Sequence, residues 1–239
     1  MIIYSSLIDL SIINFKHNTY LLHGEYMKLE KQEILRKLLH IAALLMPIGI
    51  FYVPEIFNLS KWVPVYVLGT LLFASVLTEV ARFKSSFVQK IFLKFFKNMM
   101  RKKEEFRITG STYILGSGFL CSLFFVNRPE ISFIALFVFI LGDAAAALVG
   151  IEFGKIKIRN KSLEGSAACF LTVFILIYFV FPYFPGIMEN FGGCLLLKHA
   201  LQLSFIVALL EFYTIKIFGT EINDNLYVPV LTGFVLFLI

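Results

Sequence analysis

The sequence has little charge for its length: Asp, Glu, Lys and Arg make up 16% of its 239 residues, whereas 59% are hydrophobic and 28 are phenylalanine. The mean hydropathy is +0.83. A soluble domain of this size cannot bury so much apolar surface, so the composition argues against a soluble protein. It predicts an integral membrane protein whose helices present phenylalanine side chains to lipid.

Cysteine is also scarce, and the motifs of common soluble nucleotide-binding proteins are absent. Cys121, Cys169 and Cys194 have no paired spacing, which argues against a disulfide framework or a zinc site and favours packing roles. The sequence contains no GxxxxGK[ST] loop and no protein-kinase signature. Residues 107–165 have no counterpart in residues 193–239, which counts against transporters built from two repeated halves.

Seven apolar runs are candidates for membrane-spanning helices, which need about 20 mainly apolar residues. They are residues 38–57, 62–81, 108–127, 131–150, 165–185, 193–213 and 223–239. Residues 85–106, between the second and third runs, alternate apolar and lysine side chains at helical spacing, which is typical of an amphipathic helix on a membrane surface. The predicted fold is an all-α polytopic membrane protein with about seven transmembrane helices plus one amphipathic interfacial helix.

Lysine and arginine are distributed unevenly among the segments that connect these runs. If the N-terminus lies inside, 19 of the 22 Lys and Arg residues fall in inner segments, chiefly residues 82–107 and 155–161. The outer loops then contain only Lys61, Arg128 and Lys198. Because basic residues in short loops stay on the cytoplasmic side, we expect a cytoplasmic N-terminus and an external C-terminus, in the inner membrane if the protein is bacterial.

The first residues fit this arrangement poorly. Residues 1–26 contain an apolar run too short to span a membrane, broken by Asp9 and Lys16, and they have neither a basic start nor a cleavage site. We expect residues 1–33 to be an N-terminal extension, with Met27 as the true start and residues 1–26 dispensable. Residues 34–239 then form one membrane-embedded domain.

Polar side chains gather in five segments that this topology places on the cytoplasmic face. They are EILRKLLH (33–40), RITGSTYILGSG (107–118), LGDAAAALVG (141–150), FGKIKIRNKSLEGS (153–166) and EINDN (221–225). Polar groups at membrane depth are costly and usually face a site or another helix. The topology was derived mainly from the basic residues, and the acidic and amide side chains were not counted. Because those side chains fall on the same face, the sequence predicts one inward-facing site.

The chemistry of these side chains narrows the kind of site. Asp143, Asp224 and the neighbouring carboxylates and amides are hard oxygen ligands, which suit Mg²⁺ better than zinc or copper. Lysines between residues 155 and 161 supply positive charge for phosphates, and glycines allow the backbone to approach a bulky anion. Together these groups are typical of phosphoryl or nucleotidyl transfer. Each also has a plainer interpretation: the Gly and Ala residues as close helix packing, the lysines as a positive-inside loop, and Glu79 with Arg82 as a simple pair.

The blocks RKLLH, TGSTYILGSG, GDAAAALVGIEFGKIKIRNKSLEGS and EINDNLYVPV, in this order, resemble the CTP-dependent lipid kinase family. This family includes dolichol kinases, phytol and farnesol kinases and CTP-dependent diacylglycerol kinases, and many bacterial members are labelled phosphatidate cytidylyltransferase. The resemblance extends from about Ile34 to the end of the chain. It implies that residues 34–239 are a lipid kinase domain, although eukaryotic dolichol kinases are much longer.

The resemblance implies a role for individual residues. Asp143 matches the aspartate expected at the nucleotide–magnesium site, and Lys161 and Glu164 match a motif expected around the nucleotide phosphates. Asn223, Asp224 and Asn225 match an asparagine–aspartate–asparagine element near the C-terminus. Arg36, Lys37 and His40 resemble an arginine–lysine…histidine element in the first span.

The expected reaction is transfer of the terminal phosphate of a nucleoside triphosphate to the hydroxyl of a membrane lipid alcohol at the cytoplasmic face. We expect Asp143 and Asp224 to bind Mg²⁺ and Lys155 and Lys161 to hold phosphates. Gly142, Gly150 and Gly154 would allow close backbone approach. The general base is either aspartate or His40, and the sequence does not decide between them.

Several alternatives stay open. A phosphatidate cytidylyltransferase making CDP-diacylglycerol would use the same parts, although the chain lacks an SxxKRxxxxKD…GGxxDRxD run. A small transporter with Asp143 and Asp224 as ion sites is a third interpretation. The preference for CTP over ATP comes only from the resemblance, and the acceptor (a polyprenol, a shorter isoprenoid alcohol or diacylglycerol) and the oligomeric state are undetermined. We expect no nucleic-acid partner, because the basic run at residues 85–106 has a lipid-type aromatic stripe.

Overall fold

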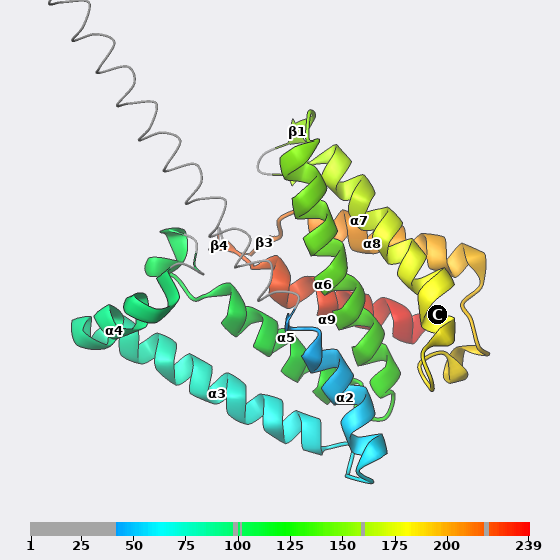
Figure 1. The fold of residues 1–239 in the computed structure, drawn as a ribbon, viewed down its shortest axis with the longest axis horizontal. Coiled ribbons are helices and arrows are strands. Elements are labelled where there is room, and N and C mark those ends of the chain that lie inside the picture. The colour runs from blue at the N-terminus through cyan, green and yellow to red at the C-terminus, as the bar shows by residue number, and fades with distance from the viewer. Residues whose placement is uncertain (1–41, 98–99, 101, 159–160, 218–219) are drawn as a thin grey trace, which may run out of the picture.

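The computed structural model describes residues 42–97, 100, 102–158, 161–217 and 220–239, and the structure below is that of these residues (Figure 1). They contain eight α-helices: α2 (Leu45–Ile56), α3 (Val63–Lys84), α4 (Ser86–Phe96), α5 (Gly110–Phe124), α6 (Pro129–Glu152), α7 (Leu163–Ile175), α8 (Leu197–Phe212) and α9 (Asp224–Leu238). The predicted all-α class is confirmed.

Three helical stretches are long and apolar enough to cross a membrane: α3, α6 and residues Leu163–Tyr183. Shorter apolar helices are α2, α5 and α9. The protein is therefore an integral membrane protein by the length and composition of its helices. Each of the seven predicted spans coincides with a helix among the described residues, although the start of the first span, residues 38–41, lies outside them. That all seven cross the bilayer stays a prediction.

Short elements interrupt the helices at places that hydropathy did not indicate. The predicted span 165–185 is α-helical only to Ile175 and then continues through a π-helical turn, η3 (Leu176–Val180), and a 3₁₀ turn, η4 (Phe181–Tyr183). Two further 3₁₀ turns are η2 (Lys102–Glu105) and η5 (Glu189–Phe191). Two antiparallel hairpins also form, β1 (Lys157–Ile158) with β2 (Lys161–Ser162) and β3 (Lys216–Ile217) with β4 (Thr220–Glu221).

Helix α6 is the centre of the bundle (Figure 1). It begins with Pro129 at its first position, where the missing N–H costs nothing. Every residue from Ile131 to Ile140 is buried, and α2, α5, α7 and α9 pack around the helix. A helix that is apolar on all sides is expected to be enclosed by others, and α6 follows that rule.

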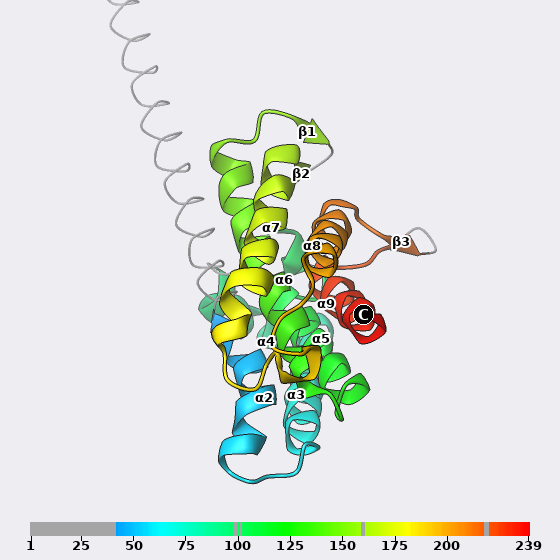
Figure 2. The same cartoon turned by 90° about the vertical axis from the view of Figure 1, so that its right-hand side faces the viewer.

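Small residues hold α7 close against α6 (Figure 2). A Cβ added to Gly165 would lie 2.6 Å from the carbonyl oxygen of Ala146, and one added to Gly142 would lie 3.0 Å from Cys169 Sγ. Helices without bulky side chains at their interface can approach closely, which is how such pairs associate in membranes. Cys169 and Cys121 are buried packing residues as expected, whereas Cys194 is exposed.

The amphipathic stretch forms α4, which projects from the rest of the bundle beside the end of α3 (Figure 1). Ser85 adopts an extended conformation between the two helices, and its side chain accepts a hydrogen bond from Val88 N. None of the residues of α4 is buried, and Phe87, Ile91 and Phe95 are all exposed. The helix is thus present as predicted, and its location on a membrane surface stays a prediction.

Hydrogen bonds join several of the segments that connect the helices to one another at one end of the bundle. Tyr52 Oη donates to Pro185 O at 3.1 Å, so the end of α2 contacts the segment after α7. Glu130, which is buried, accepts from Arg128 at 2.9 Å and from Asn190 at 3.0 Å. These are the segments that the predicted topology places outside.

Gly165→Ala should destabilise the protein, because the added methyl group meets the backbone carbonyl of Ala146 rather than a flexible side chain. Overpacking of this kind costs about 1–3 kcal/mol, and we expect a lower midpoint of thermal unfolding in detergent. Gly49→Ala is the matched control, because no atom lies within 4 Å of the new methyl group. An equal midpoint for the Gly165 variant and the wild type would contradict the close α6–α7 packing.

Candidate functional site

Three carboxylates from three helices meet in the structure. One oxygen each of Asp143, Glu211 and Asp224 lies within 4.8 Å of the other two. Asp143 is in the second half of α6, Glu211 is near the end of α8, and Asp224 is the first residue of α9. Glu211 is only 4% exposed. The fold therefore brings together acidic groups that are far apart in the sequence.

The ammonium group of Lys161 lies among these carboxylates. Lys161 Nζ donates to Asp224 Oδ2 at 3.0 Å and forms a short ion pair with Glu211. The lysine side chain is 26% exposed and that of Asp224 32%, so the cluster opens to solvent on that side. Lys161 is thus paired with two of the three acidic side chains of the cluster, Glu211 and Asp224.

The environment keeps Lys161 protonated. Burial favours its neutral form, but the charges of Asp224 and Glu211 and the hydrogen bonds to them outweigh burial and raise the pKa of Lys161 above its ordinary value. The side chain therefore carries its positive charge throughout the physiological pH range.

The β1–β2 hairpin determines where Lys161 leaves the backbone. Lys161 pairs with Ile158 in the hairpin, and the next residue, Ser162, caps α7 by accepting a hydrogen bond from Gly165 N at 3.1 Å. Glu164 accepts from Ile156 N at 3.2 Å. The backbone of Lys161 and Ser162 is thus paired with β1 and joined to the start of α7, and the lysine side chain extends from this hairpin to the carboxylates.

The glycines predicted to approach phosphates have close packing partners in the structure. A Cβ on Gly150 would lie 2.9 Å from Ser162 Oγ, and one on Gly154 would lie 2.2 Å from the carbonyl oxygen of Gly150. Gly142 faces Cys169, as described above. Close packing therefore explains why a residue without a side chain occupies each of the three positions. Contact of these glycines with a nucleotide stays a prediction.

The two asparagines around Asp224 hold the start of α9. Asn223 Oδ1 caps the helix by accepting from Asn225 N at 3.0 Å. Asn225 Nδ2 donates to the carbonyl oxygen of Gly110, at the start of α5, at 3.2 Å. In the structure both asparagines position the Asp224 carboxylate, and their predicted contact with a nucleotide is untested.

Tyr227 joins α9 to the end of α8. Its hydroxyl lies 3.0 Å from Leu210 O and 2.6 Å from Tyr213 O, so it bridges the residues on both sides of Glu211. This contact places Glu211 beside Asp224. Glu211 and Tyr227 were not predicted from the sequence. The signal for Glu211 was available, because it is a carboxylate inside an apolar run that the topology does not require, as Asp143 is.

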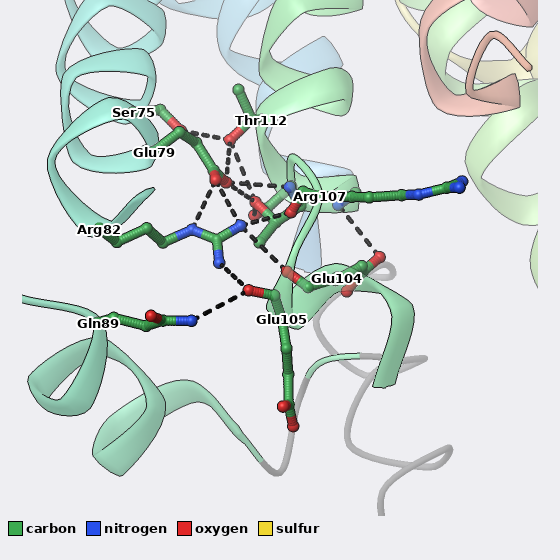
Figure 3. A network of polar contacts seen from close by, with 11 residues as sticks. Ser75, Glu79, Arg82, Gln89, Glu104, Glu105, Arg107 and Thr112 are labelled. Carbon is green, nitrogen blue, oxygen red and sulfur yellow. Dashed lines mark hydrogen bonds and ion pairs between the residues drawn. The ribbon is translucent and has the colours of Figure 1, made fainter. Parts of the chain in front are cut away.

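A buried polar network supports α5 from the side of α3 (Figure 3). Arg82, which is fully buried, donates to Glu79 at 2.6 Å and to the carbonyl oxygens of Glu104, Glu105 and Arg107. The Glu79 carboxylate accepts from the amide of Thr109 at 3.0 Å. The sequence suggested that Glu79 and Arg82 simply pair with each other. In the structure, the pair also forms hydrogen bonds with the segment that precedes α5.

This network connects to the carboxylate cluster through the first residue of α5. Glu104 Oε1 accepts from Gly110 N at 3.3 Å, and Gly110 O accepts the hydrogen bond from Asn225. The start of α5 is thus held by α3 on one side and holds the start of α9 on the other. These hydrogen bonds, which are partly shielded from solvent, connect the two elements on either side of Gly110.

The remaining predicted site residues lie away from the cluster or outside the described residues. Lys155 is exposed in the segment between α6 and β1. Glu164, at the start of α7, bonds Ile156 as described. His40, with Arg36 and Lys37, lies outside the described residues, so its predicted role is untested.

The donor set fits a divalent cation such as Mg²⁺. Three carboxylates on separate helices offer hard oxygen atoms, which magnesium prefers, and the group found among the described residues contains no His or Cys. Asp143, Glu211 and Asp224 are the residues that would hold it.

The chain is similar to three proteins. It is 28% identical over 204 residues to an uncharacterized protein of Rickettsia prowazekii, covering 81% of this chain and 88% of that protein. It is 30% identical over 138 residues to an uncharacterized protein of Methanocaldococcus jannaschii, covering 57% and 61%. It is 32% identical over 110 residues to CTP-dependent diacylglycerol kinase 1 of Saccharomyces cerevisiae, covering 44% of this chain and 37% of the yeast protein. No family model and no solved structure matches the chain.

Arg82→Ala should destabilise the protein strongly, because it leaves the Glu79 carboxylate buried without its cation and removes the donor from three loop carbonyls. Breaking a buried pair by removing one partner costs about 3–5 kcal/mol. We expect a large fall in the thermal unfolding midpoint in detergent and faster proteolysis between residues 102 and 109.

Lys84→Ala is the matched control for this prediction, because Lys84 is an exposed cation on the same helix. If both variants unfolded at the wild-type midpoint, the network in Figure 3 would not support α5.

Proposed function

We propose that the protein transfers the terminal phosphate of a nucleoside triphosphate, with CTP favoured, to the hydroxyl group of a membrane lipid alcohol. The observation that carries this proposal is the meeting of Asp143, Glu211 and Asp224 with the Lys161 ammonium inside an apolar helical bundle. A cation-binding carboxylate group beside a fixed positive charge is suited to phosphoryl transfer. Distant similarity to a CTP-dependent diacylglycerol kinase supports the same class of reaction.

The proposed site residues form two groups, one that binds the metal ion and one that binds the phosphates. Asp143, Glu211 and Asp224 hold Mg²⁺, which neutralises charge on the phosphate oxygens when it is bound. Lys161 binds phosphate oxygens, and Lys155, Glu164, Asn223 and Asn225 stay candidates for nucleotide contacts.

The reaction forms a bond between the lipid oxygen and the terminal phosphorus, and it breaks the bond from that phosphorus to the bridging oxygen. The nucleoside diphosphate leaves, and the hydroxyl proton passes to a base. Asp143 and Asp224 are the candidates among the described residues, and His40 is the candidate outside them.

The surroundings of the cluster favour an acceptor that stays in the membrane. The helices that contribute the carboxylates are mostly apolar, and the cluster opens to solvent beside Asp224. A lipid alcohol would present its hydroxyl at such a boundary, whereas the nucleotide would arrive from water. We include a polyprenol or dolichol, a shorter isoprenoid alcohol and diacylglycerol as acceptor classes, the last because of the yeast relative.

We further propose that the cluster faces the cytoplasm, with seven crossings, a cytoplasmic N-terminus and α4 on the inner surface. Support comes from the two groups of connecting segments. The contacts of Tyr52 and Glu130 join segments expected outside, whereas those of Arg82, Asn225 and Lys161 join segments expected inside. Residues 34–239 would form the whole kinase domain.

A product assay tests the proposal. Purified full-length protein is incubated with Mg²⁺ and CTP or ATP labelled on the terminal phosphate, together with each class of lipid alcohol. Label in the lipid supports the kinase. Parallel reactions with phosphatidate and CTP labelled on the first phosphate test the cytidylyltransferase alternative, in which a CDP-lipid and pyrophosphate form. Lipid that stays unlabelled with either nucleotide in every reaction would refute the kinase proposal. Transfer that continues at an undiminished rate after EDTA has removed the metal would refute the metal assignment.

Asp143→Asn and Asp224→Asn should each lower the rate of lipid phosphorylation by about 100-fold or more, because each removes a charged metal ligand. The proteins should still insert and unfold near the wild-type midpoint, since the amide keeps the size of the side chain. Glu152→Gln is the matched control, as Glu152 is an exposed carboxylate at the end of α6. Near-normal turnover in both aspartate variants would refute the assignment.

Glu211→Gln should lower the rate in the same assay, because it removes a third carboxylate from the cation site while Asp224 still holds Lys161. Glu189→Gln, an exposed carboxylate in η5, should leave the rate unchanged. Wild-type activity in the Glu211 variant would restrict the metal site to the two aspartates.

A further inference from the structure

The Lys161 ammonium and a divalent cation bound by the three-carboxylate group would share two carboxylate groups, those of Glu211 and Asp224. Lys161 Nζ contacts Glu211 Oε1 and Asp224 Oδ2, and both carboxylates belong to the group of three that lies within 4.8 Å. A cation bound by that group would lie close to the position of the ammonium. Two positive charges so near each other repel strongly where the dielectric constant is low.

The lysine also compensates the negative charge of Glu211 and Asp224. Glu211 is 4% exposed, and Asp143 and Asp224 lie beside it, so the group without Lys161 would contain three mutually repelling carboxylates. A buried charge without a partner is strongly destabilising. Lys161 therefore supplies a positive charge at the position where a bound cation would also lie.

A metal ion that arrives alone would have to separate Lys161 from both carboxylates and leave the ammonium without a partner. A metal ion that arrives on a triphosphate brings phosphate oxygens, which accept the displaced ammonium. The backbone at Lys161 is held by β1 and by the start of α7, so the movement is confined to the flexible four-carbon side chain.

We propose that Lys161 is a displaceable internal cation: its ammonium occupies the carboxylate group until a metal–triphosphate complex arrives, and then moves from Glu211 and Asp224 to the phosphate oxygens. The carboxylate group consequently binds metal weakly by itself and tightly together with a triphosphate. This inference rests on the proposed function for the identity of the phosphate ligand, and it adds an order to the binding of metal and nucleotide.

The test measures binding of Mn²⁺ to the purified full-length protein in detergent at neutral pH, by electron paramagnetic resonance and without lipid. In the absence of nucleotide, Lys161→Met should bind Mn²⁺ about tenfold or more tightly than the wild type, because methionine keeps much of the length but not the competing charge. Lys157→Met is the matched control, as Lys157 is an exposed lysine in the same hairpin, and it should match the wild type. Equal or weaker Mn²⁺ binding by the folded Lys161 variant would overturn the proposal.

A second measurement uses only the wild-type protein and does not depend on the folding of a variant. Addition of a CTP analogue with a methylene group between its last two phosphorus atoms should raise the Mn²⁺ affinity of the protein by about tenfold or more. Affinity that is the same with and without the analogue would overturn the coupling. The nucleotide-free comparison involves no lipid phosphorylation, so failure of the proposed kinase reaction and failure of the competition at Lys161 are seen in separate experiments.

Discussion

The pairing of charged side chains inside an apolar bundle is the constraint on which the candidate site depends. Glu211 is nearly inaccessible to solvent, and it lies beside Asp143 and Asp224. Such a group is stable only with positive charge beside it, and Lys161 supplies that charge from the hairpin before α7. The same need underlies the proposed binding of a metal–phosphate complex, which would bring both a cation to replace the lysine and an anion to accept it.

The surrounding structure keeps this group in place by short-range contacts. Glycines between α6 and α7 allow the hairpin containing Lys161 to lie against α6. Tyr227 joins α9 to the end of α8, and Asn225 joins α9 to α5. The buried Arg82–Glu79 pair then holds α5. Several of the polar residues that resemble a family motif thus have structural contacts, and the proposed chemistry involves only a few side chains.

Much of the fold was predictable because hydropathy is a local property. Apolar runs predicted α2, α3 and α5 to α9, and alternating lysine and phenylalanine predicted α4. The π-helical turn after Ile175 and the two hairpins were not predicted, because they depend on local hydrogen bonds that composition does not record. Asp143, Asp224 and Lys161 were predicted as site residues and do lie together, whereas Glu164 bonds the backbone of Ile156.

The sequence by itself determined that the chain is a helical membrane protein, and it predicted that the unusual polar groups lie on one side, since both inferences follow from the number and order of apolar and charged residues. Tertiary structure decided which of those groups meet. Glu211 joined the two aspartates only through the packing of α8 against α9, and the two partners of Lys161, Glu211 and Asp224, are 50 and 63 residues further along the chain. Contacts between residues so distant depend on how helices pack, because no local pattern encodes them.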